Sequence, residues 1–252
     1  MGCHLTSNSS RVLITGGSSG IGFAVAKRLL EDDSKLLLVA RDEQRLQAAQ
    51  QALKADYPDA DVVVFVADTS VPAEIKKIFA YLQQQKCSLS GLVHCAGSML
   101  EAPLMMVREE QIDEQYAVHL KSALMLCQSA SKMMLRAKQG SLVLVSSVVA
   151  EQGSSGQVVY ASMKSAMSGL VKSLAQELGT FNIRVNCVSP GVIDTPLLAH
   201  YDDEKKQQLA EKSALKRLGK ASEVANLVRF LLADESRYIT AQNIAVDGGL
   251  RL

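Results

Sequence analysis

A glycine-rich turn between an apolar segment and a helical segment constrains the fold of this chain more than any other feature. Residues 11–14 are a short apolar strand candidate, and residues 23–30 have the composition of a helix. The turn between them reads Thr15-Gly16-Gly17-Ser18-Ser19-Gly20-Ile21-Gly22. Glycines let a backbone turn sharply and approach a pyrophosphate closely, and the helix amino terminus adds free N–H groups and a partial positive charge. This order of segments predicts a dinucleotide-binding unit rather than a purely structural turn.

The rest of the chain repeats the alternation of strand and helix. A chain of 252 residues that is 48% hydrophobic can bury a large core. Strands that alternate with helices indicate a parallel sheet covered on both faces. We therefore expect one doubly wound α/β domain of the Rossmann type over residues 1–252, with a parallel seven-stranded sheet. Its strand candidates are residues 11–15, 35–40, 61–66, 91–95, 141–146, 183–188 and 243–246.

A second motif combines Tyr160, Lys164 and Ser147. An ammonium one helical turn from a phenol favours the phenolate, so Lys164 should lower the pKa of Tyr160 from its free value of about 10. Ser147 follows the apolar run 141–145, which would place its hydroxyl at the carboxyl end of a buried strand. A surface tyrosine beside a solvated lysine is the alternative, but the dinucleotide-binding unit favours a proton-transfer site.

Together these motifs resemble the classical short-chain dehydrogenase/reductases over nearly the whole chain. The resemblance implies hydride transfer between a nicotinamide cofactor and a carbonyl or secondary alcohol. Ser147 and Tyr160 would hold the ketone oxygen, Tyr160 would protonate the alkoxide, and Lys164 would bind the nicotinamide ribose. Residues 184–195 and 238–240 look most like the 3-oxoacyl-[acyl-carrier-protein] reductases of fatty acid biosynthesis and their relatives. The other matching positions are Thr15 to Gly22, Asp68, Cys95-Ala96-Gly97, Pro190-Gly191 and Val246-Asp247-Gly248-Gly249.

The resemblance also implies a set of cofactor contacts. Asp68 would meet the adenine, although a plain strand-ending cap is the alternative, and Ile193 and Thr195 would hold the carboxamide. The irregular stretch of about 190–220 looks like the family's substrate lid, and its charged run 201–206 also suits a solvated helix face. The full expected cofactor set is Gly16, Ser18, Ser19, Gly20, Ile21, Gly22, Arg41, Asp68, Thr69, Cys95, Ala96, Gly97, Tyr160, Lys164, Pro190, Gly191, Ile193 and Thr195.

Arg41, at the end of the second strand candidate, favours NADP(H). An acidic residue there would bind the ribose hydroxyls of NAD, whereas a guanidinium pairs with a 2′-phosphate. Asp42 and Glu43 follow directly and weaken this preference, and Ser19 stands where NADP-dependent relatives often carry a basic residue. We expect NADP(H) to be preferred, with NAD(H) still open.

Two positions depart from the family pattern. The family usually reads Asn-Asn-Ala-Gly after the fourth strand, whereas this chain has Cys95 before Ala96 and should lose some support for the strand. His119 stands at the place of the family's catalytic asparagine, whose main-chain carbonyl holds a relay water in relatives. A relay role and a buried structural histidine both stay open for His119.

A 3-oxoacyl thioester is the first substrate hypothesis, and acyl carrier protein is the corresponding partner. Acyl carrier proteins are acidic, so the basic residues Lys132, Arg136 and Lys138 could dock one, although Phe181 stands where such reductases commonly have a basic residue. A free small alcohol, sugar, steroid or quinone is the alternative substrate, and a low-turnover dinucleotide-binding sensor or scaffold is the alternative class. The resemblance implies a homotetramer built through the helices of His119 and Tyr160, whose apolar faces would also suit a monomer.

Composition argues against several other classes. A net charge of +1 provides no field for nucleic acid or anionic membranes, and no apolar run approaches the roughly 20 residues of a membrane span. Five irregularly spaced cysteines without a secretory signal predict reduced thiols and a cytoplasmic protein without a metal. Gly2 and Cys3 fit a short lipidation pattern, but we expect residues 1–10 to be an ordinary flexible tail.

Overall fold

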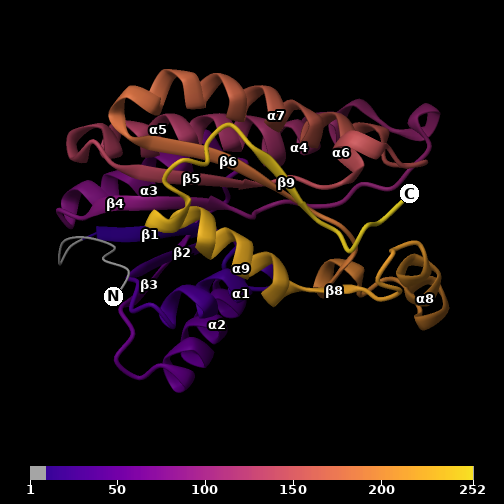
Figure 1. Cartoon of the computed structure of the whole chain (residues 1–252), viewed down its shortest axis with the longest axis horizontal. Helices are drawn as coiled ribbons and strands as arrows, with labels where there is room; N and C mark the ends of the chain where they lie inside the picture. The colour runs from indigo at the N-terminus through magenta and orange to yellow at the C-terminus, as the bar shows by residue number, and fades with distance from the viewer. Residues whose placement is uncertain (1–9, 252) are drawn as a thin grey trace.

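Seven parallel strands form one sheet in the order β3-β2-β1-β4-β5-β6-β9, as Figure 1 shows. The order reverses between β1 and β4, and this switch point is where open α/β sheets bind ligands, at the carboxyl ends of the strands. The predicted seven-stranded parallel sheet is therefore confirmed. The strands are β1 (Ser10–Thr15), β2 (Leu36–Ala40), β3 (Val62–Val66), β4 (Ser88–His94), β5 (Gly140–Val145), β6 (Ile183–Pro190) and β9 (Asn243–Val246).

The computed structural model describes residues 10–251. Ser10 already belongs to β1, so the predicted tail of residues 1–10 is one residue too long at its carboxyl end. Its other residues, including the Gly2 and Cys3 pattern, lie outside the described residues. Within residues 10–251, no helix is long and apolar enough to cross a bilayer.

Helices cover both faces of the sheet and create two cores. Strand residues are buried on both sides because parallel sheets in α/β proteins carry helices on each face. Successive residues of a strand point to opposite faces, so Leu13 packs in one core and Ile14 in the other. One face is covered by α3 (Pro72–Gln84), α5 (Ser122–Ala137) and α7 (Val158–Leu178), and the other by α1 (Gly20–Leu30), α2 (Glu43–Asp56) and α9 (Ala221–Leu232).

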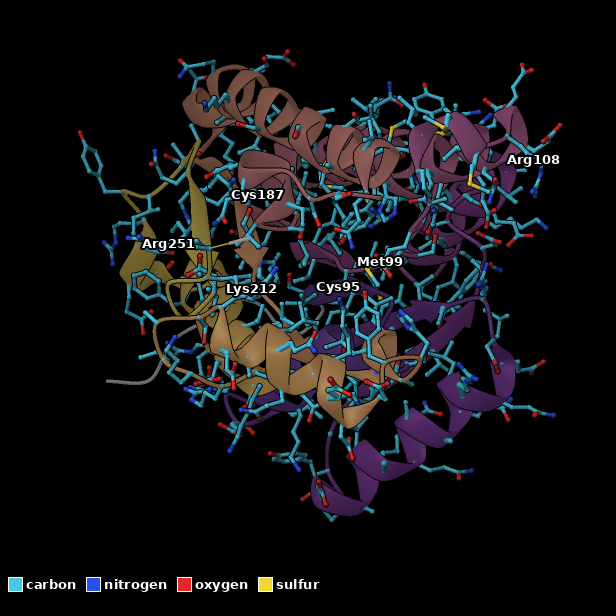
Figure 2. All side chains as sticks on the ribbon, turned by 90° about the vertical axis from the view of Figure 1, so that its right-hand side faces the viewer. Cys95, Met99, Arg108, Cys187, Lys212 and Arg251 are labelled. Atoms are coloured by element: carbon cyan, nitrogen blue, oxygen red, sulfur yellow. The ribbon has the colours of Figure 1, made fainter. Side chains whose placement is uncertain are left out.

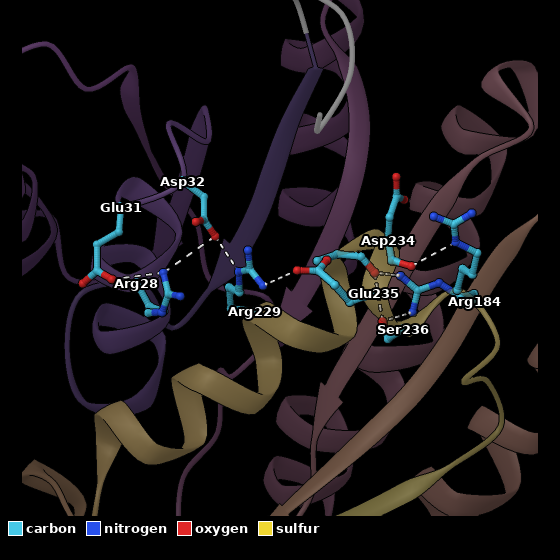
Figure 3. A network of polar contacts seen from close by, with 10 residues as sticks. Arg28, Glu31, Asp32, Arg184, Arg229, Asp234, Glu235 and Ser236 are labelled. Atoms are coloured by element: carbon cyan, nitrogen blue, oxygen red, sulfur yellow. Dashed lines mark hydrogen bonds and ion pairs between the residues drawn. The ribbon is translucent and has the colours of Figure 1, made fainter. Parts of the chain in front are cut away.

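A polar network fastens α9 at the amino edge of the sheet (Figure 3). Arg229 of α9 pairs with Asp32, just after α1, at 2.5 Å and with Glu235 at 2.9 Å. Arg184 at the start of β6 donates to the carbonyl of Leu231 at 2.6 Å, near the end of α9. The contact of Arg229 with Asp32 holds the carboxyl end of α1 at the edge where the strands begin. The amino end of α1 therefore lies at the opposite edge of the sheet, where the strands end.

The stretch 190–220 is more regular than the sequence predicts. It contains a two-stranded sheet of β7 (Ile193–Asp194) and β8 (Gly219–Lys220) and the helix α8 (Asp203–Glu211). Asp202 caps α8 by accepting a hydrogen bond from the Lys205 backbone N–H at 2.7 Å. The charged run 201–206 is therefore largely the first turn of a helix. Shorter elements are η1 (Leu104–Met106), α4 (Glu109–Gln115), the π-helix η2 (Tyr116–Lys121), α6 (Val149–Gln152), η3 (Gly179–Phe181), η4 (Pro196–Leu198) and η5 (Asp234–Ser236).

Candidate active site

The glycine-rich turn forms a cradle between β1 and α1 that side chains would fill. Gly16 and Gly20 have φ of 68° and 54°, in the left-handed region that favours glycine. A Cβ on Gly22 would lie 2.3 Å from the Gly16 carbonyl oxygen, so only glycine allows α1 to approach the turn this closely. Ser19, the N-cap of α1, makes no side-chain capping bond, which leaves the first N–H groups of the helix open to a ligand. The cradle therefore fits a pyrophosphate.

Two adjoining cavities collect every residue that the sequence predicts for the site. The first, of about 310 Å³, contains Arg41, Asp68, Thr69, Ala96 and the predicted glycine-loop residues. The second, of about 490 Å³, contains His119, Ser147, Tyr160, Lys164, Pro190, Gly191 and Ile193. Ile21, Cys95, Gly97 and Thr195 line both. Figure 2 looks onto this edge of the molecule, with Cys95 and Met99 near its centre.

Ser147, Tyr160 and Lys164 meet in the second cavity. Ser147 lies just beyond β5, while Tyr160 and Lys164 lie one turn apart on α7. The Lys164 ammonium donates to the Val145 carbonyl at 2.8 Å and lies 5.7 Å from the centroid of the Tyr160 ring. Val145, the last residue of β5, thus holds Lys164. Ser147, two residues beyond the strand, lies beside Tyr160.

Burial controls the pKa values of both groups. Burial raises the pKa of Tyr160 to about 12, against a smaller lowering by a hydrogen bond with Ser147. The same effect lowers the pKa of Lys164 to about 8. The predicted lowering of the Tyr160 pKa is therefore not found: removal of the phenol from water dominates, and Lys164 is not among the causes of the shift. Tyr160 is protonated at neutral pH, the state required of a general acid.

The second cavity has one apolar side and one polar side. Leu198, Leu209 and Leu250 supply apolar surface. On the polar side, Glu101 accepts hydrogen bonds from Tyr201 at 2.6 Å and from Gln157 at 2.9 Å. These bonds join the segment after β4, the segment before α7 and the segment before α8 around one space.

Comparisons with known proteins agree with this geometry. A family model described as enoyl-(acyl carrier protein) reductase matches residues 16–251. The chain is 34% identical over 242 residues to the 3-oxoacyl-[acyl-carrier-protein] reductase FabG of Chlamydia trachomatis, covering 94% of this chain and 96% of the relative. It is 36% identical over 239 residues to carbonyl reductase family member 4 of Xenopus laevis, covering 95% and 97%. The chain belongs to the short-chain dehydrogenase/reductase family.

Solved structures of short-chain dehydrogenase/reductases superpose on the chain along most of its length. Levodione reductase has a TM-score of 0.91 at 29% identity and covers 96% of this chain and 97% of its own. The 3-oxoacyl-[acyl-carrier protein] reductase of Brucella melitensis has a TM-score of 0.90 at 26% identity, covering 98% and 92%. The chain is thus an oxidoreductase of a family that binds a nicotinamide dinucleotide.

His119, which stands at the place of the family's catalytic asparagine, packs edge-on against Tyr160. Its ring lies 5.3 Å from the tyrosine ring at 79°, and its Nε2 donates to the Ser98 carbonyl at 2.7 Å. Burial lowers the pKa of His119 to about 2, so the imidazole is neutral. A Cβ on Gly97 would lie 2.6 Å from the ring, so glycine at that position makes room for it. These contacts support the structural interpretation of His119.

We expect His119→Asn to keep turnover within a few fold of the unchanged protein. The neutral ring cannot exchange a proton near pH 6.5, and the main-chain carbonyl is present with either residue. The measurement is the pH–rate profile of the variant beside that of the original protein, with cofactor affinity and thermal unfolding as controls. A loss of a hundredfold or more, with both controls unchanged, would instead make the His119 side chain a catalytic group.

His94 is a structural residue whose role the sequence analysis missed. Its ring lies 2.8 Å from the Thr15 hydroxyl through Nδ1 and 3.1 Å from the Ser122 hydroxyl through Nε2. Ser122 donates in turn to the Val118 carbonyl at 2.6 Å, and Thr15 accepts from the Ala96 N–H at 3.3 Å. These bonds connect the glycine loop to the π-helix that carries His119. His94 therefore supplies the side-chain support that was expected to be lost at Cys95. The sequence signal for this role was a histidine at the end of an apolar strand.

Arg45 is the second residue that the sequence analysis missed. It lies in the first turn of α2 and lines the first cavity together with Arg41. The Asp42 carboxylate caps α2 by accepting from the Arg45 backbone N–H at 3.0 Å, and it lies 3.3 Å from the Arg45 guanidinium. Asp42 is thus engaged by its own helix, while two guanidinium groups border the cavity.

Proposed function

We propose that the chain reduces a 3-oxoacyl thioester to the 3-hydroxyacyl product with NADPH. The observation that carries the proposal is the meeting of Ser147, Tyr160 and Lys164 where the glycine-loop cavity adjoins the second cavity. The relatives named as 3-oxoacyl-[acyl-carrier-protein] reductases support the choice of substrate.

In this mechanism the chain positions a carbonyl and delivers a proton. When bound, the nicotinamide supplies the hydride. Ser147 and Tyr160 donate hydrogen bonds to the carbonyl oxygen, and Tyr160 transfers its phenolic proton as negative charge develops there. Lys164, held by the Val145 carbonyl, has further N–H donors for the nicotinamide ribose and stabilises the phenolate that forms.

The preference for NADPH is supported by the charges around the first cavity. Arg41 and Arg45 border it, and Lys77 lines a neighbouring hollow together with Arg41. Asp42, the acidic residue that could have favoured NAD, is occupied in capping α2. A dianionic 2′-phosphate at this place would meet guanidinium groups rather than a free carboxylate.

We expect Arg41→Ala to weaken NADPH binding about ten- to a hundredfold while changing NADH binding much less, because one charge-assisted contact contributes about 1.5–3 kcal/mol. Titration calorimetry with both cofactors measures the effect. Lys54→Ala, near the exposed end of α2, is the matched control and should change neither constant. Equal affinities of the unchanged protein for NADPH and NADH would overturn the proposed preference.

The basic cluster predicted to dock an acyl carrier protein lies far from the reacting groups. Lys132, Arg136 and Lys138 are exposed near the amino end of β5, whereas Ser147 follows its carboxyl end. The six residues of β5 span about 20 Å. Phe181 lies at the same distant edge, before β6. A carrier docked there would need a long arm to reach Tyr160.

We also propose assembly into a homotetramer through the helical segments of His119 and Tyr160. Exposed apolar side chains on these segments support it: Tyr116 is 41% exposed, Leu124 47% and Val158 44%. Met105 and Met106, 94% and 70% exposed, lie close to them in sequence. Apolar surface of this kind marks interaction sites more often than it stays in water. Sedimentation equilibrium measures the assembly directly.

Absorbance of NADPH during incubation with an acetoacetyl thioester tests the proposed function. Consumption of NADPH with formation of the 3-hydroxyacyl product is the expected result. Turnover of a free ketone but not of the thioester would favour the alternative substrates. Tight NADPH binding without turnover of either would favour a sensor or scaffold.

A further inference from the structure

Three residues of the α8 segment line one wall of the second cavity. Lys205, Leu209 and Lys212 all border it, with Lys212 at the carboxyl cap of α8. Their spacing of four and three residues places them on one side of a helix. The α8 segment therefore contributes a leucine between two lysines to the cavity lining, an arrangement that neither the fold nor the proposed catalysis requires.

The ammonium groups of the two cavity lysines form no ion pair with an acidic residue of the described chain. Among residues 10–251, no carboxylate lies within ion-pair distance of the Lys205 or Lys212 ammonium group. By contrast, the nearby Arg217 pairs with Glu223 at 2.6 Å. No acid among residues 10–251 therefore neutralises the positive charge of these two lysines.

Two of the three carboxylates of α8 accept hydrogen bonds from glutamines of the same helix. Glu204 accepts from Gln208 and Glu211 accepts from Gln207, each at 3.3 Å. Within the described chain, Glu101 is the one carboxylate that lines the cavity. Its Oε1 accepts from Tyr201 and Gln157, and its Oε2 lies 3.7 Å from the His200 ring. Glu101 is thus engaged on the polar side and leaves the lysines to face the cavity.

The end of the chain brings a third cation to the same place. The Arg251 backbone N–H donates to the Lys212 carbonyl at 3.2 Å, and Gln152 donates to the Leu250 carbonyl at 3.0 Å. Figure 2 shows Lys212 and Arg251 near each other, away from Arg108 on the far side of the view. The cavity lining therefore contains Ser147 and Tyr160 as well as Lys205 and Lys212, and Arg251 lies beside Lys212.

We propose that Lys205 and Lys212 bind the phosphate of a substrate carried on a phosphorylated thioester arm, such as acyl phosphopantetheine. This inference rests on the proposed reduction of a 3-oxoacyl thioester. The carbonyl lies at Tyr160, the uncharged arm passes Leu209 and Leu250, and the phosphate meets two ammonium groups at the rim. Recognition of the arm here needs no contact with the distant cluster of Lys132, Arg136 and Lys138.

The test compares acetoacetyl-4′-phosphopantetheine with acetoacetyl-pantetheine, which differ by one phosphate. In the unchanged protein, we expect kcat/KM to be at least about tenfold higher for the phosphorylated substrate, the size of one charge-assisted contact. In Lys205→Gln/Lys212→Gln this ratio should fall to about one, and added salt should lower it in the unchanged protein. The control Lys206→Gln removes a charge from the same helix at a position that does not line the cavity and should keep the ratio.

Two outcomes separate this inference from the proposed function. Equal kcat/KM for the two substrates in the unchanged protein would overturn the phosphate site while leaving thioester reduction established. If neither thioester is reduced, the proposed function fails, and calorimetric titration with 4′-phosphopantetheine itself decides the site. Binding that the double variant loses and Lys206→Gln keeps would support it, and equal dissociation constants for all three proteins would overturn it.

Discussion

Replacing Tyr160 with phenylalanine is expected to lower turnover at least a hundredfold while cofactor affinity stays nearly unchanged. A positioned general acid commonly contributes about a hundred- to ten-thousandfold, and phenylalanine removes the only proton that the phenol can give. The ring keeps its place, since it is 8% exposed and contacts the imidazole of His119 edge-on. Single-turnover kinetics with NADPH and an acetoacetyl thioester measures the chemical step, and calorimetry measures cofactor binding.

The matched control for this variant is Tyr238→Phe, because Tyr238 is fully exposed at 101% and lines neither cavity. It should behave like the unchanged protein in both measurements. If Tyr160→Phe retained more than about a tenth of the turnover, Tyr160 would not be the general acid. A large loss of cofactor affinity would show that the hydroxyl acts mainly in binding.

The second large effect is expected from Gly22→Ala, which should weaken cofactor binding at least about tenfold and lower stability by about 1–3 kcal/mol. The backbone of Gly22 is not in the left-handed region, so alanine is acceptable there in itself. The cost comes from the new Cβ, 2.3 Å from the Gly16 oxygen, which forces α1 away from the turn. Calorimetric binding of NADPH and thermal unfolding measure the two effects.

Gly179→Ala is the control for this close approach. Nothing lies within 4 Å of a Cβ at Gly179, and its backbone is helical, so this variant should match the unchanged protein in both measurements. If Gly22→Ala bound NADPH as tightly as Gly179→Ala, the turn could open without loss, and the glycine cradle would not be the pyrophosphate site.

The fold was predictable from sequence because its signals are local. Apolar strand candidates and the turn of residues 15–22 mark the sheet and its switch point, and the strands lie within a few residues of their predicted places. The stretch 190–220 was harder because β7 and β8 have only two residues each and pair residues 26 positions apart. A strand of two residues is too short to show an alternating hydrophobic pattern.

The sequence predicted which residues gather at the two cavities, but it predicted their electrostatics less well. The spacing of Tyr160 and Lys164 shows a nearby ammonium, yet burial decides the direction of the tyrosine pKa, and burial comes from distant segments. Likewise, the capping of α2 by Asp42 leaves Arg41 and Arg45 at the cavity, and this depends on where the helix begins. His94 pairs with residues 79 and 28 positions away, a relation that one sequence does not display.

The hydrogen-bond chain through His94 runs in one direction. The Ala96 N–H donates to Thr15, Thr15 to the imidazole Nδ1, Nε2 to Ser122, and Ser122 to the Val118 carbonyl. Each hydrogen in this series is already used in a hydrogen bond. Turning the His94 ring over would therefore break the bonds at both ring nitrogens, and adding a proton would disrupt the series. Burial lowers the pKa of His94 to about 3 and keeps the ring neutral. The series of bonds therefore ties the position of the glycine loop to the π-helix whose His119 packs against Tyr160.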